Sequence, residues 1–302
     1  MRKNLWKTVA VVMAASAMML TACGGNGSGT NVNATEKSGG TETSKETEKE
    51  SDTEKTDTSA DQTEDLSLQK VKDAGKLVLG LDATFKPMGY TDENNEIVGF
   101  DIDLAEAVCE KLGVELVKEP INWETKEQDL SVGKIDCIWN GLSVSPSREE
   151  TFNLSEPYME NAMVFVVPES SEVTSSKDLL DKKIAVQNGS TAQDILEESE
   201  FKDSAQITSI ATNVEALQQM DINLVDAVFM DDVVAQYEIK NSDKAYRVLE
   251  EGLAKEEYAI AFRKEDQALR DEVQKILSEL KADGTVEEIS TKWFGSDITT
   301  IK

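Results

Sequence analysis

Polar side chains gather in the stretch NGLSVSPSREE, residues 140–150, in a pattern that suits an anion. Gly141 lets a ligand approach the backbone closely, Ser143 offers a hydroxyl, and Arg148 can hold a carboxylate through two parallel hydrogen bonds. A Ser-Pro pair at 145–146 indicates a helix start, which puts Arg148 in the first turn. The alternative is a capped helix with a solvated arginine, and spacing alone does not decide between them.

A second polar set lies in the later half of the chain. The stretch 189–193 reads GSTAQ, in which Ser190 is a candidate N-cap paired with Gln193, and free N–H groups at such a helix start attract anions. Asp231 follows an apolar run, 227–230, and can accept hydrogen bonds from an ammonium group. The simpler interpretations are a plain capped helix and an ordinary turn or cap aspartate.

Asp82, Phe85 and Trp123 complete the candidate set. Phe85 follows the first expected strand and Trp123 the second, so both rings can line the same rim. There they would stack on a flat or aliphatic group, or face a cation. The alternative is that both rings are ordinary core residues.

These candidates follow segments that read as strands alternating with helices. Apolar runs at 76–82, 114–117 and 135–139 are separated by a helix that Asp101 would cap and by a second helix around 125–132. This order predicts a parallel, doubly wound sheet, in which ligands bind beyond the carboxyl ends of the strands.

The pattern restarts in the second half, with strands predicted at 183–187, 207–210 and 226–230. Two such units predict two lobes whose strand ends face a shared cleft. The extended apolar runs 164–167 and 258–262 are placed where the chain could cross between the lobes. A long amphipathic helix after the second run is expected to pack back on the first lobe, through Leu269, Val273, Ile276, Leu277 and Leu280.

The front of the chain reads as a processing signal. Basic residues precede an apolar run at 8–20, which is too short to span a bilayer but suits a secretory segment. The run ends in LTAC, which resembles the bacterial lipobox, so residues 1–22 are expected to be a lipoprotein signal peptide and Cys23 the acylated residue. The alternative is an ordinary signal peptide with a stray cysteine.

Residues 23–65 are rich in Gly, Ser, Thr, Glu and Lys and poor in apolar residues, which predicts a disordered acidic tether. About 40 flexible residues have an r.m.s. span of about 35 Å. The net charge of −28 argues against nucleic acid and against adhesion to anionic lipid heads.

The chain has no histidine, which removes His-based acid–base catalysis and most zinc sites. Two cysteines, Cys109 and Cys137, remain in the expected folded part. A disulfide between them is permitted outside the cell, and two buried free thiols are equally compatible with the sequence.

The segment VGFDIDL at 98–104 resembles the signature of the bacterial family 3 solute-binding proteins, the polar amino-acid receptors of ABC importers. Further similar segments are 82–88, 133–136, 140–143 with Arg148, 189–191, and Asp226 with Asp231. The resemblance implies an α/β, two-lobed periplasmic-binding-protein type II fold with a two-strand hinge. Lobe 1 would comprise 66–160 and 256–298, and lobe 2 would comprise 161–255.

The resemblance also implies a role for each candidate residue. Arg148 would clamp the α-carboxylate of an amino acid, helped by Thr191 and by the backbone N–H groups of Ser143 and Thr191. Asp231 would accept from the α-ammonium group, with the Gly141 carbonyl as a second acceptor.

The side chain of the ligand would lie between Phe85 and Trp123, and Asp82 would bind its polar end. This sequence departs from several relatives at Asn140-Gly141, where they have a serine pair, and from some at Met230, where they have glutamine. The full expected ligand set is Asp82, Phe85, Trp123, Asn140, Gly141, Ser143, Arg148, Ser190, Thr191 and Asp231.

The implied protein is a monomeric, lipid-anchored, extracytoplasmic receptor without a cofactor or metal, which delivers a polar amino acid to an ABC permease by hinge closure. The aromatic pair with Asp82 favours a cationic or uncharged polar side chain. One alternative is an enzyme similar to the cyclohexadienyl dehydratases, which would need a general acid over a ring substrate. The other is a sensory receptor that reports occupancy to a signalling partner.

Overall fold

The computed structural model describes residues 64–250, 252 and 254–302. The expected signal peptide, Cys23 and all but the last two residues of the expected tether lie outside these described residues. Within the described part of the chain, no helix is both long and apolar enough to cross a bilayer. The structure thus covers the segment that was expected to form the two lobes.

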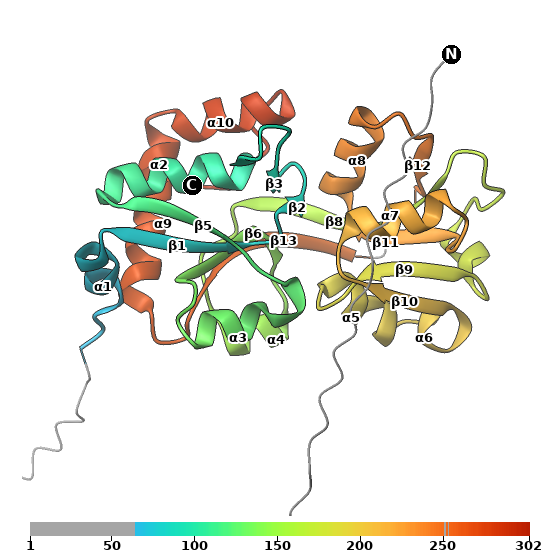
Figure 1. The fold of residues 1–302 in the computed structure, drawn as a ribbon, viewed down its shortest axis with the longest axis horizontal. Coiled ribbons are helices and arrows are strands. Elements are labelled where there is room, and N and C mark those ends of the chain that lie inside the picture. The colour runs from blue at the N-terminus through green and yellow to red at the C-terminus, as the bar shows by residue number, and fades with distance from the viewer. Residues whose placement is uncertain (1–63, 251, 253) are drawn as a thin grey trace, which may run out of the picture. The chain divides into compact units, whose positions relative to one another are not determined.

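Strands and helices alternate through the first half of the described chain (Figure 1). The main elements are α1 (Ser67–Ala74), β1 (Lys76–Leu81), α2 (Phe100–Leu112), β5 (Glu115–Pro120), the 3-10 turn η1 (Trp123–Thr125), α3 (Lys126–Ser131), β6 (Cys137–Ser143) and α4 (Pro146–Thr151). A small antiparallel sheet is inserted between β1 and α2, formed by β2 (Thr84–Phe85), β3 (Gly89–Thr91) and β4 (Ile97–Val98).

The alternation resumes in the second half and ends with two helices. The strands are β7 (Asn153–Leu154), β8 (Met159–Pro168), β9 (Lys183–Gln187), β10 (Gln206–Ile210), β11 (Ala227–Asp231), β12 (Tyr246–Val248) and β13 (Ala254–Phe262). The helices are η2 (Ser176–Leu179), α5 (Thr191–Glu198), α6 (Phe201–Ser204), α7 (Asn213–Asp221), α8 (Asp232–Asn241), α9 (Gln267–Ala282) and α10 (Thr285–Phe294).

The main sheet consists of two parallel groups joined by two antiparallel strands. Its order is β10-β9-β11-β8-β13-β6-β1-β5, with β7 and β12 pairing beside this path. The groups β5-β1-β6 and β10-β9-β11 are parallel within themselves, and β8 pairs antiparallel with both β11 and β13. The expected type II architecture is confirmed, with β8 and β13 as the crossing strands.

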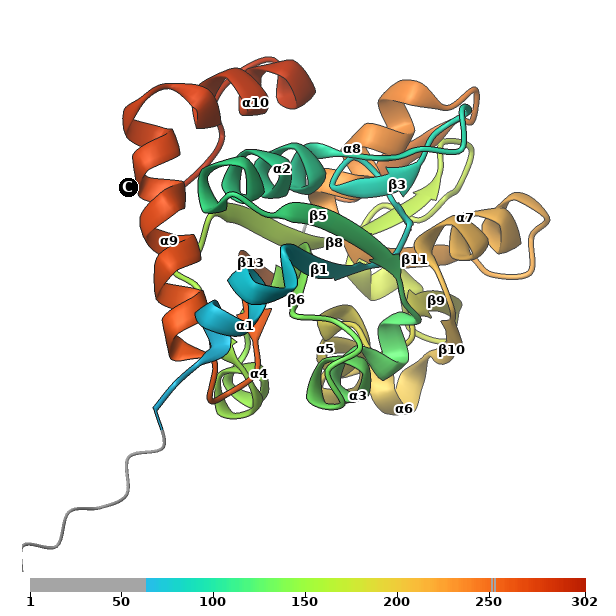
Figure 2. The same cartoon turned by 60° about the vertical axis from the view of Figure 1, so that its left-hand side comes forward.

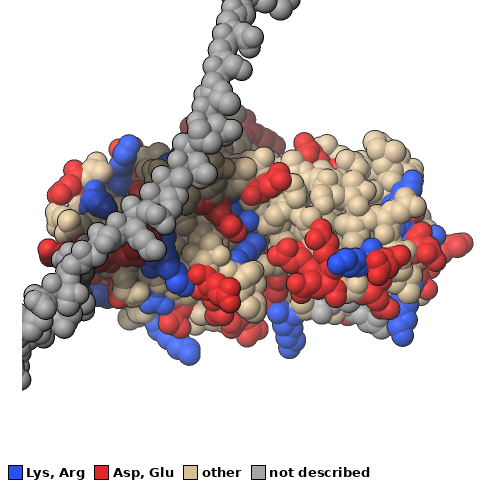
Figure 3. Space-filling view, turned by 90° about the horizontal axis from the view of Figure 1, so that it is seen from below, with Lys and Arg blue, Asp and Glu red and all other residues tan. Residues whose placement is uncertain are grey.

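Helices cover both faces of each parallel group (Figures 1 and 2). In the first lobe, α2 and α10 lie on one face and α3 and α4 on the other; in the second, α7 and α8 lie opposite α5 and α6. Strands β6 and β11 are buried along their whole length, as expected for central strands covered on both faces. Acidic side chains lie over both lobes on the face in Figure 3, with basic side chains among them.

Two differences from the sequence prediction bear on the site. Strand β6 continues through 140–143, which were expected to follow it, because β13 pairs with this segment up to Ser143. Asp101 does not cap α2: Gly99 occupies the N-cap, and the N–H groups of Phe100 and Asp101 donate to backbone carbonyls at 87–88. Because these carbonyls accept from the first N–H groups of α2, the Asp101 carboxylate is not needed as a cap and can accept other hydrogen bonds.

Helix α9 confirms its expected role. The five predicted apolar residues, at 269, 273, 276, 277 and 280, are buried, and the helix packs against α1 and α2 of the first lobe. Cys109 and Cys137 are buried free thiols in the same lobe, so the disulfide alternative is not realised. Burial raises the pKa of the Cys109 thiol to about 12.

Candidate functional site

A small cavity of about 10 Å³ lies where the strand ends of the two lobes meet. It is lined by all of the expected ligand residues except Asp82 and Asn140, together with Met163 and Gln187. Its volume is about that of one water molecule, so the two lobes are closed onto each other in this structure.

Arg148 reaches this cavity from the start of α4. The predicted Ser-Pro helix start is present, and the side chain is only 5% exposed, which excludes the solvated-arginine alternative. Its Nη1 donates to the Ser143 carbonyl at 2.8 Å, and its Nη2 donates to the Gly189 carbonyl at 3.4 Å. Among the described arginines, only Arg263 and Arg270 form ion pairs, so the buried charge of Arg148 lacks a carboxylate partner.

Asp231 faces the same cavity from the last position of β11 and is 5% exposed. Its Oδ1 accepts from the Asn161 amide at 2.8 Å and from the Tyr258 hydroxyl at 2.6 Å. Burial raises the pKa of Asp231 to about 7, against the hydrogen bond from Tyr258, which lowers it. Within the described residues, no lysine or arginine comes within 4.0 Å of this carboxylate.

The start of α5 lies opposite Arg148. Ser190 accepts from the Gln193 N–H at 3.2 Å, which confirms the predicted N-cap. The Gln193 side chain accepts from Gly189 at 2.9 Å rather than from Ser190, so the expected capping box is shifted by one residue. Thr191 is the first residue of the helix and lines the cavity.

Gly141 has a φ of +60° inside strand β6. A Cβ atom there would lie 2.8 Å from a ring carbon of Phe85, so only glycine fits this position without a shift. Phe85 and Trp123 are both buried and packed in apolar clusters, and both also line the cavity. The rings are therefore core residues and cavity walls at once.

Asp82 and Asn140 lie beside the cavity and bond to each other, the Asp82 N–H donating to Asn140 Oδ1 at 3.0 Å. Asp82 Oδ2 accepts from Gln187 Nε2 at 2.7 Å, across the cleft. Gln187 was not predicted from the sequence, although it is a polar residue at the end of the predicted strand 183–187, the same signal that identified the other candidates.

Lys126 was also missed, because a lysine at a helix start is ordinarily solvated. It is 3% exposed, and its Nζ donates to the Gly189 carbonyl at 2.8 Å and to the Trp123 carbonyl at 3.2 Å. Burial, and then the charge of Arg148, lowers the pKa of Lys126 to about 8. A further contact between the lobes joins the rings of Tyr90 and Tyr237, whose centroids are 6.4 Å apart.

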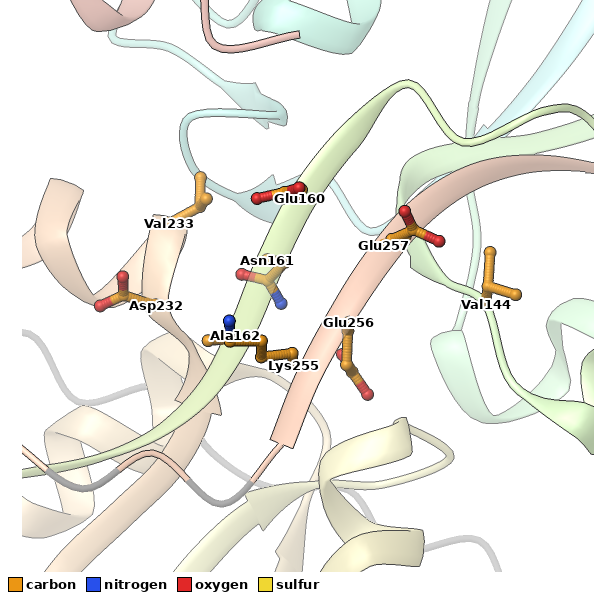
Figure 4. Close-up of a pocket in the computed structure, with 9 residues that line it drawn as sticks. All are labelled: Val144, Glu160, Asn161, Ala162, Asp232, Val233, Lys255, Glu256 and Glu257. Atoms are coloured by element: carbon orange, nitrogen blue, oxygen red, sulfur yellow. The ribbon is translucent and has the colours of Figure 1, made fainter. Parts of the chain in front are cut away.

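A larger groove, of about 590 Å³, runs over the crossing strands β8 and β13 (Figure 4). Its walls carry Glu160, Glu256 and Glu257, and Asn161 connects it to the site by donating to Asp231. Arg148 does not line this groove. The basic side chain that lines the groove, Lys255, is exposed. The buried opposite charges, Arg148 and Asp231, face the smaller cavity, which is therefore the stronger candidate despite its size.

A family model for bacterial extracellular solute-binding proteins, family 3, matches residues 77–296. Among curated proteins, the L-cystine-binding protein TcyJ of Escherichia coli (strain K12) is 27% identical over 77% of this chain and 87% of its own length. ABC transporter arginine-binding protein 1 of the same strain is 30% identical over 73% of this chain and 91% of its own length.

Solved structures show the same relationship. An ABC uptake transporter substrate binding protein from Streptococcus pneumoniae with bound histidine has a TM-score of 0.76 and 36% identity, covering 78% of this chain and 98% of its own. The ancestral amino acid-binding protein AncCDT-1, described as a precursor of cyclohexadienyl dehydratase, has a TM-score of 0.70 and 33% identity, covering 76% and 99%.

Proposed function

The chain belongs to family 3 of the bacterial extracellular solute-binding proteins, and we propose that it binds a polar amino acid by its α-carboxylate and α-ammonium groups. One observation carries the proposal: Arg148 and Asp231 are buried, carry opposite charges and line the same cavity. Neither has an ion-pair partner among the described residues. Burying an unpaired charge is costly. A zwitterion supplies both missing counter-charges at once.

The carboxylate would bind at Arg148, with Ser143 and Thr191 as further donors. Arg148 donates only to backbone carbonyls in this structure, so its guanidinium keeps N–H groups for a bidentate bond to an anion. The ammonium group would bind at Asp231, whose Oδ1 is already oriented by Tyr258 and Asn161.

Hinge closure would couple these contacts to transport, with β8 and β13 as the hinge between lobe 1 (66–160 and 256–298) and lobe 2 (161–255). Arg148 lies in the first expected lobe and Asp231 in the second, so a bound zwitterion favours the closed form over the open one. Moving this equilibrium from 1:99 to 99:1 requires about 5.5 kcal/mol of differential affinity. Two buried charge-assisted interactions are of that order.

The side chain of the ligand would lie between Phe85 and Trp123, with its polar end at Asp82. A side-chain donor on the ligand would replace Gln187 as the partner of Asp82 Oδ2. This contact favours a cationic or uncharged polar side chain, in keeping with the arginine, histidine and cystine named for the relatives.

We also propose that the protein is held at the outer face of the cell membrane by acylated Cys23 and passes its ligand to an ABC permease. The LTAC sequence supports the anchor, and the names of the ABC-transporter relatives support the permease. Replacing Cys23 with serine should release the protein into the culture medium; retention of the Cys23→Ser protein in the membrane fraction would contradict the anchor.

The test of amino-acid binding is a thermal-shift screen of the unaltered chain against all common amino acids, followed by calorimetry on the hits. A ligand at 100 times its dissociation constant stabilises the folded state by about 2.7 kcal/mol. We expect one or a few polar amino acids to raise the melting temperature. No shift with any of them would contradict the proposal.

A second candidate, an eliminating enzyme, is favoured by the likeness to AncCDT-1 and by a buried Asp231 whose pKa of about 7 suits a general acid. Incubation with prephenate or arogenate separates the two functions. Aromatic product formed by the unaltered chain but not by an Asp231→Asn variant would favour the enzyme.

A further inference from the structure

Asp101 is the first aspartate of the VGFDIDL segment, and its side chain is completely buried although it does not line the cavity. Its Oδ2 accepts a hydrogen bond from the Gly141 N–H at 2.8 Å and another from the Tyr158 hydroxyl at 2.9 Å. Its Oδ1 has no hydrogen-bond partner among the described residues. All the bonding of this carboxylate is thus concentrated on one oxygen, which holds the backbone of a cavity residue.

The bond to Gly141 replaces a ladder bond of the sheet. Between Ala259 and Ala261 the pairing of β13 with β6 shifts register, and Gly141 adopts its φ of +60° opposite this irregularity. The peptide before Gly141 is fixed by Asp101, and the peptide after it is fixed by the pairing of Leu142 with Ala259. Because peptide groups are planar and rigid, these two restraints set the direction of the Gly141 carbonyl.

A parallel arrangement serves the second lobe. Tyr158 donates to Asp101 as Tyr258 donates to Asp231, and the two tyrosine rings lie 6.2 Å apart on adjoining crossing-strand segments. The Tyr158 N–H also donates to the Tyr258 carbonyl at 2.9 Å. Two buried carboxylates, one in each lobe, are therefore oriented by one pair of neighbouring tyrosines.

Burying the carboxylate of Asp101 costs free energy that its packing contacts do not offset. Burial raises the pKa of Asp101 to about 7, and its hydrogen bonds with Tyr158 and Gly141 offset only part of this rise. An apolar residue of similar size would avoid that cost. What the carboxylate supplies in return is a fixed Gly141 and a negative potential behind the cavity wall.

We propose that Asp101 is a positioning residue for the ammonium end of the ligand: it holds the Gly141 N–H so that the Gly141 carbonyl accepts from the α-ammonium group. This inference rests on the proposed amino-acid binding. Asp101 touches no ligand itself, and it acts on one end of the zwitterion only. The carboxylate end, at Arg148, is independent of it.

The test compares two ligands on three proteins. The ligands are the best-binding amino acid and its analogue with hydrogen in place of the α-ammonium group. The proteins are the unaltered chain, Asp101→Asn and Tyr158→Phe. Each ligand is titrated against each protein by thermal shift, which reaches millimolar dissociation constants. We expect Asp101→Asn to weaken the amino acid at least about tenfold and the analogue less than about twofold. Tyr158→Phe removes the Tyr158 hydroxyl, which donates to Asp101 and accepts a longer bond of 3.3 Å from the Gly141 N–H. It leaves the 2.8 Å bond between Gly141 and Asp101 in place, and should keep the ratio of the two affinities.

Equal weakening of both ligands by Asp101→Asn would show a merely structural role and overturn the inference while leaving amino-acid binding intact. Absence of amino-acid binding by the unaltered chain would overturn the proposed function and this inference with it. If Asp101→Asn does not fold, the backbone amide signal of Gly141 in the unaltered chain is followed by NMR. It should shift more with the amino acid than with the analogue, and equal shifts would overturn the inference.

Discussion

The two glycine-bearing segments that face each other across the cavity are held in different ways. In the first, 140–143, Gly141 lies inside a strand and is fixed by its own lobe, through the sheet and Asp101. In the second, 189–191, Gly189 lies in a turn, and its carbonyl accepts from Lys126 and Arg148 of the opposite lobe. Folding is enough to build the first segment, whereas the surroundings of the second are complete only when the lobes close.

The largest expected effect comes from removing Arg148, whose guanidinium donates to a backbone carbonyl in each of the two segments. We expect Arg148→Ala and Asp231→Ala each to weaken binding at least about tenfold, roughly 1.4 kcal/mol, with the larger loss for Arg148. Calorimetry measures the loss, and Lys202→Ala, at an exposed position, is the control. Near-native affinity in either variant would contradict the proposed site.

Alanine at the two glycines separates folding from closure. At Gly141 the new Cβ would meet Phe85 of its own lobe, so we expect the unfolding free energy to fall by about 1–3 kcal/mol in urea titrations. At Gly189 the new Cβ would lie 3.0 Å from the Cα of Glu124 in the opposite lobe. Its φ of +69° adds strain of about 1–2 kcal/mol, which lowers the unfolding free energy in the open and closed forms alike. The clash arises only on closure, so affinity should also fall several-fold. Equal effects on stability and affinity at both positions would remove the distinction.

The pH dependence of binding tests Asp231, which faces Asn161, Tyr258 and the charges of Arg148 and Glu256. Its pKa of about 7 means that it must lose a proton to accept an ammonium group below pH 7. Affinity should therefore rise from pH 5 to about pH 7, by up to about tenfold per unit, and then level off. Asp231→Asn should flatten this profile, and a slope that persists in Asp231→Asn would assign it to another group.

The stability of the ligand-free protein should show the opposite trend. Between the ordinary value of 3.8 and the raised pKa of about 7, the folded chain binds more protons at Asp231 than the unfolded chain does. The unfolding free energy contributed by this group therefore decreases as pH rises through that window. Urea titrations at pH 5 and pH 8 measure the difference, and Asp231→Asn should reduce it.

The smallest expected effect concerns closure alone. Tyr90 and Tyr237 touch across the lobes without lining the cavity. An aromatic pair of this kind contributes about 0.5–1.5 kcal/mol, so Tyr237→Leu should weaken ligand binding about two- to tenfold, mainly through faster release. Tyr90→Leu should have the same effect, and the double variant should lose no more than either alone. Additive losses would show that the two rings do not act as a pair.

Features that depend on interactions within a few residues could be predicted from the sequence, whereas features that depend on contacts between distant segments could not. The caps at Ser145 and Ser190 were predicted correctly because side-chain and backbone groups within a few residues determine them. The extension of β6 through 140–143 was not, because its partner β13 lies more than a hundred residues later. Burial of Lys126 was missed for the same reason, since its acceptor Gly189 belongs to the other lobe.

The candidate site shows the same division. Polar residues after strands were expected to converge, and most of the expected set does line one cavity. Asp82 and Asn140 were expected to line it as well, but they bond to each other, and Asp82 also accepts from Gln187. Sequence spacing places residues at the correct edge of the sheet, whereas hydrogen bonds between distant segments decide which side chains face the cavity.

The position of β13 also constrains the order in which the chain can fold. This strand lies between β8 and β6 in the sheet, yet it is synthesised long after both. Until it emerges, β6 and β8 each lack one neighbour, and unpaired strand edges favour aggregation. Proteins of this extracellular family must be exported. Because β13 completes the first lobe, that lobe stays incomplete until residues 254–262 have been synthesised. The strand that joins the lobes thereby also delays completion of the fold until late in synthesis.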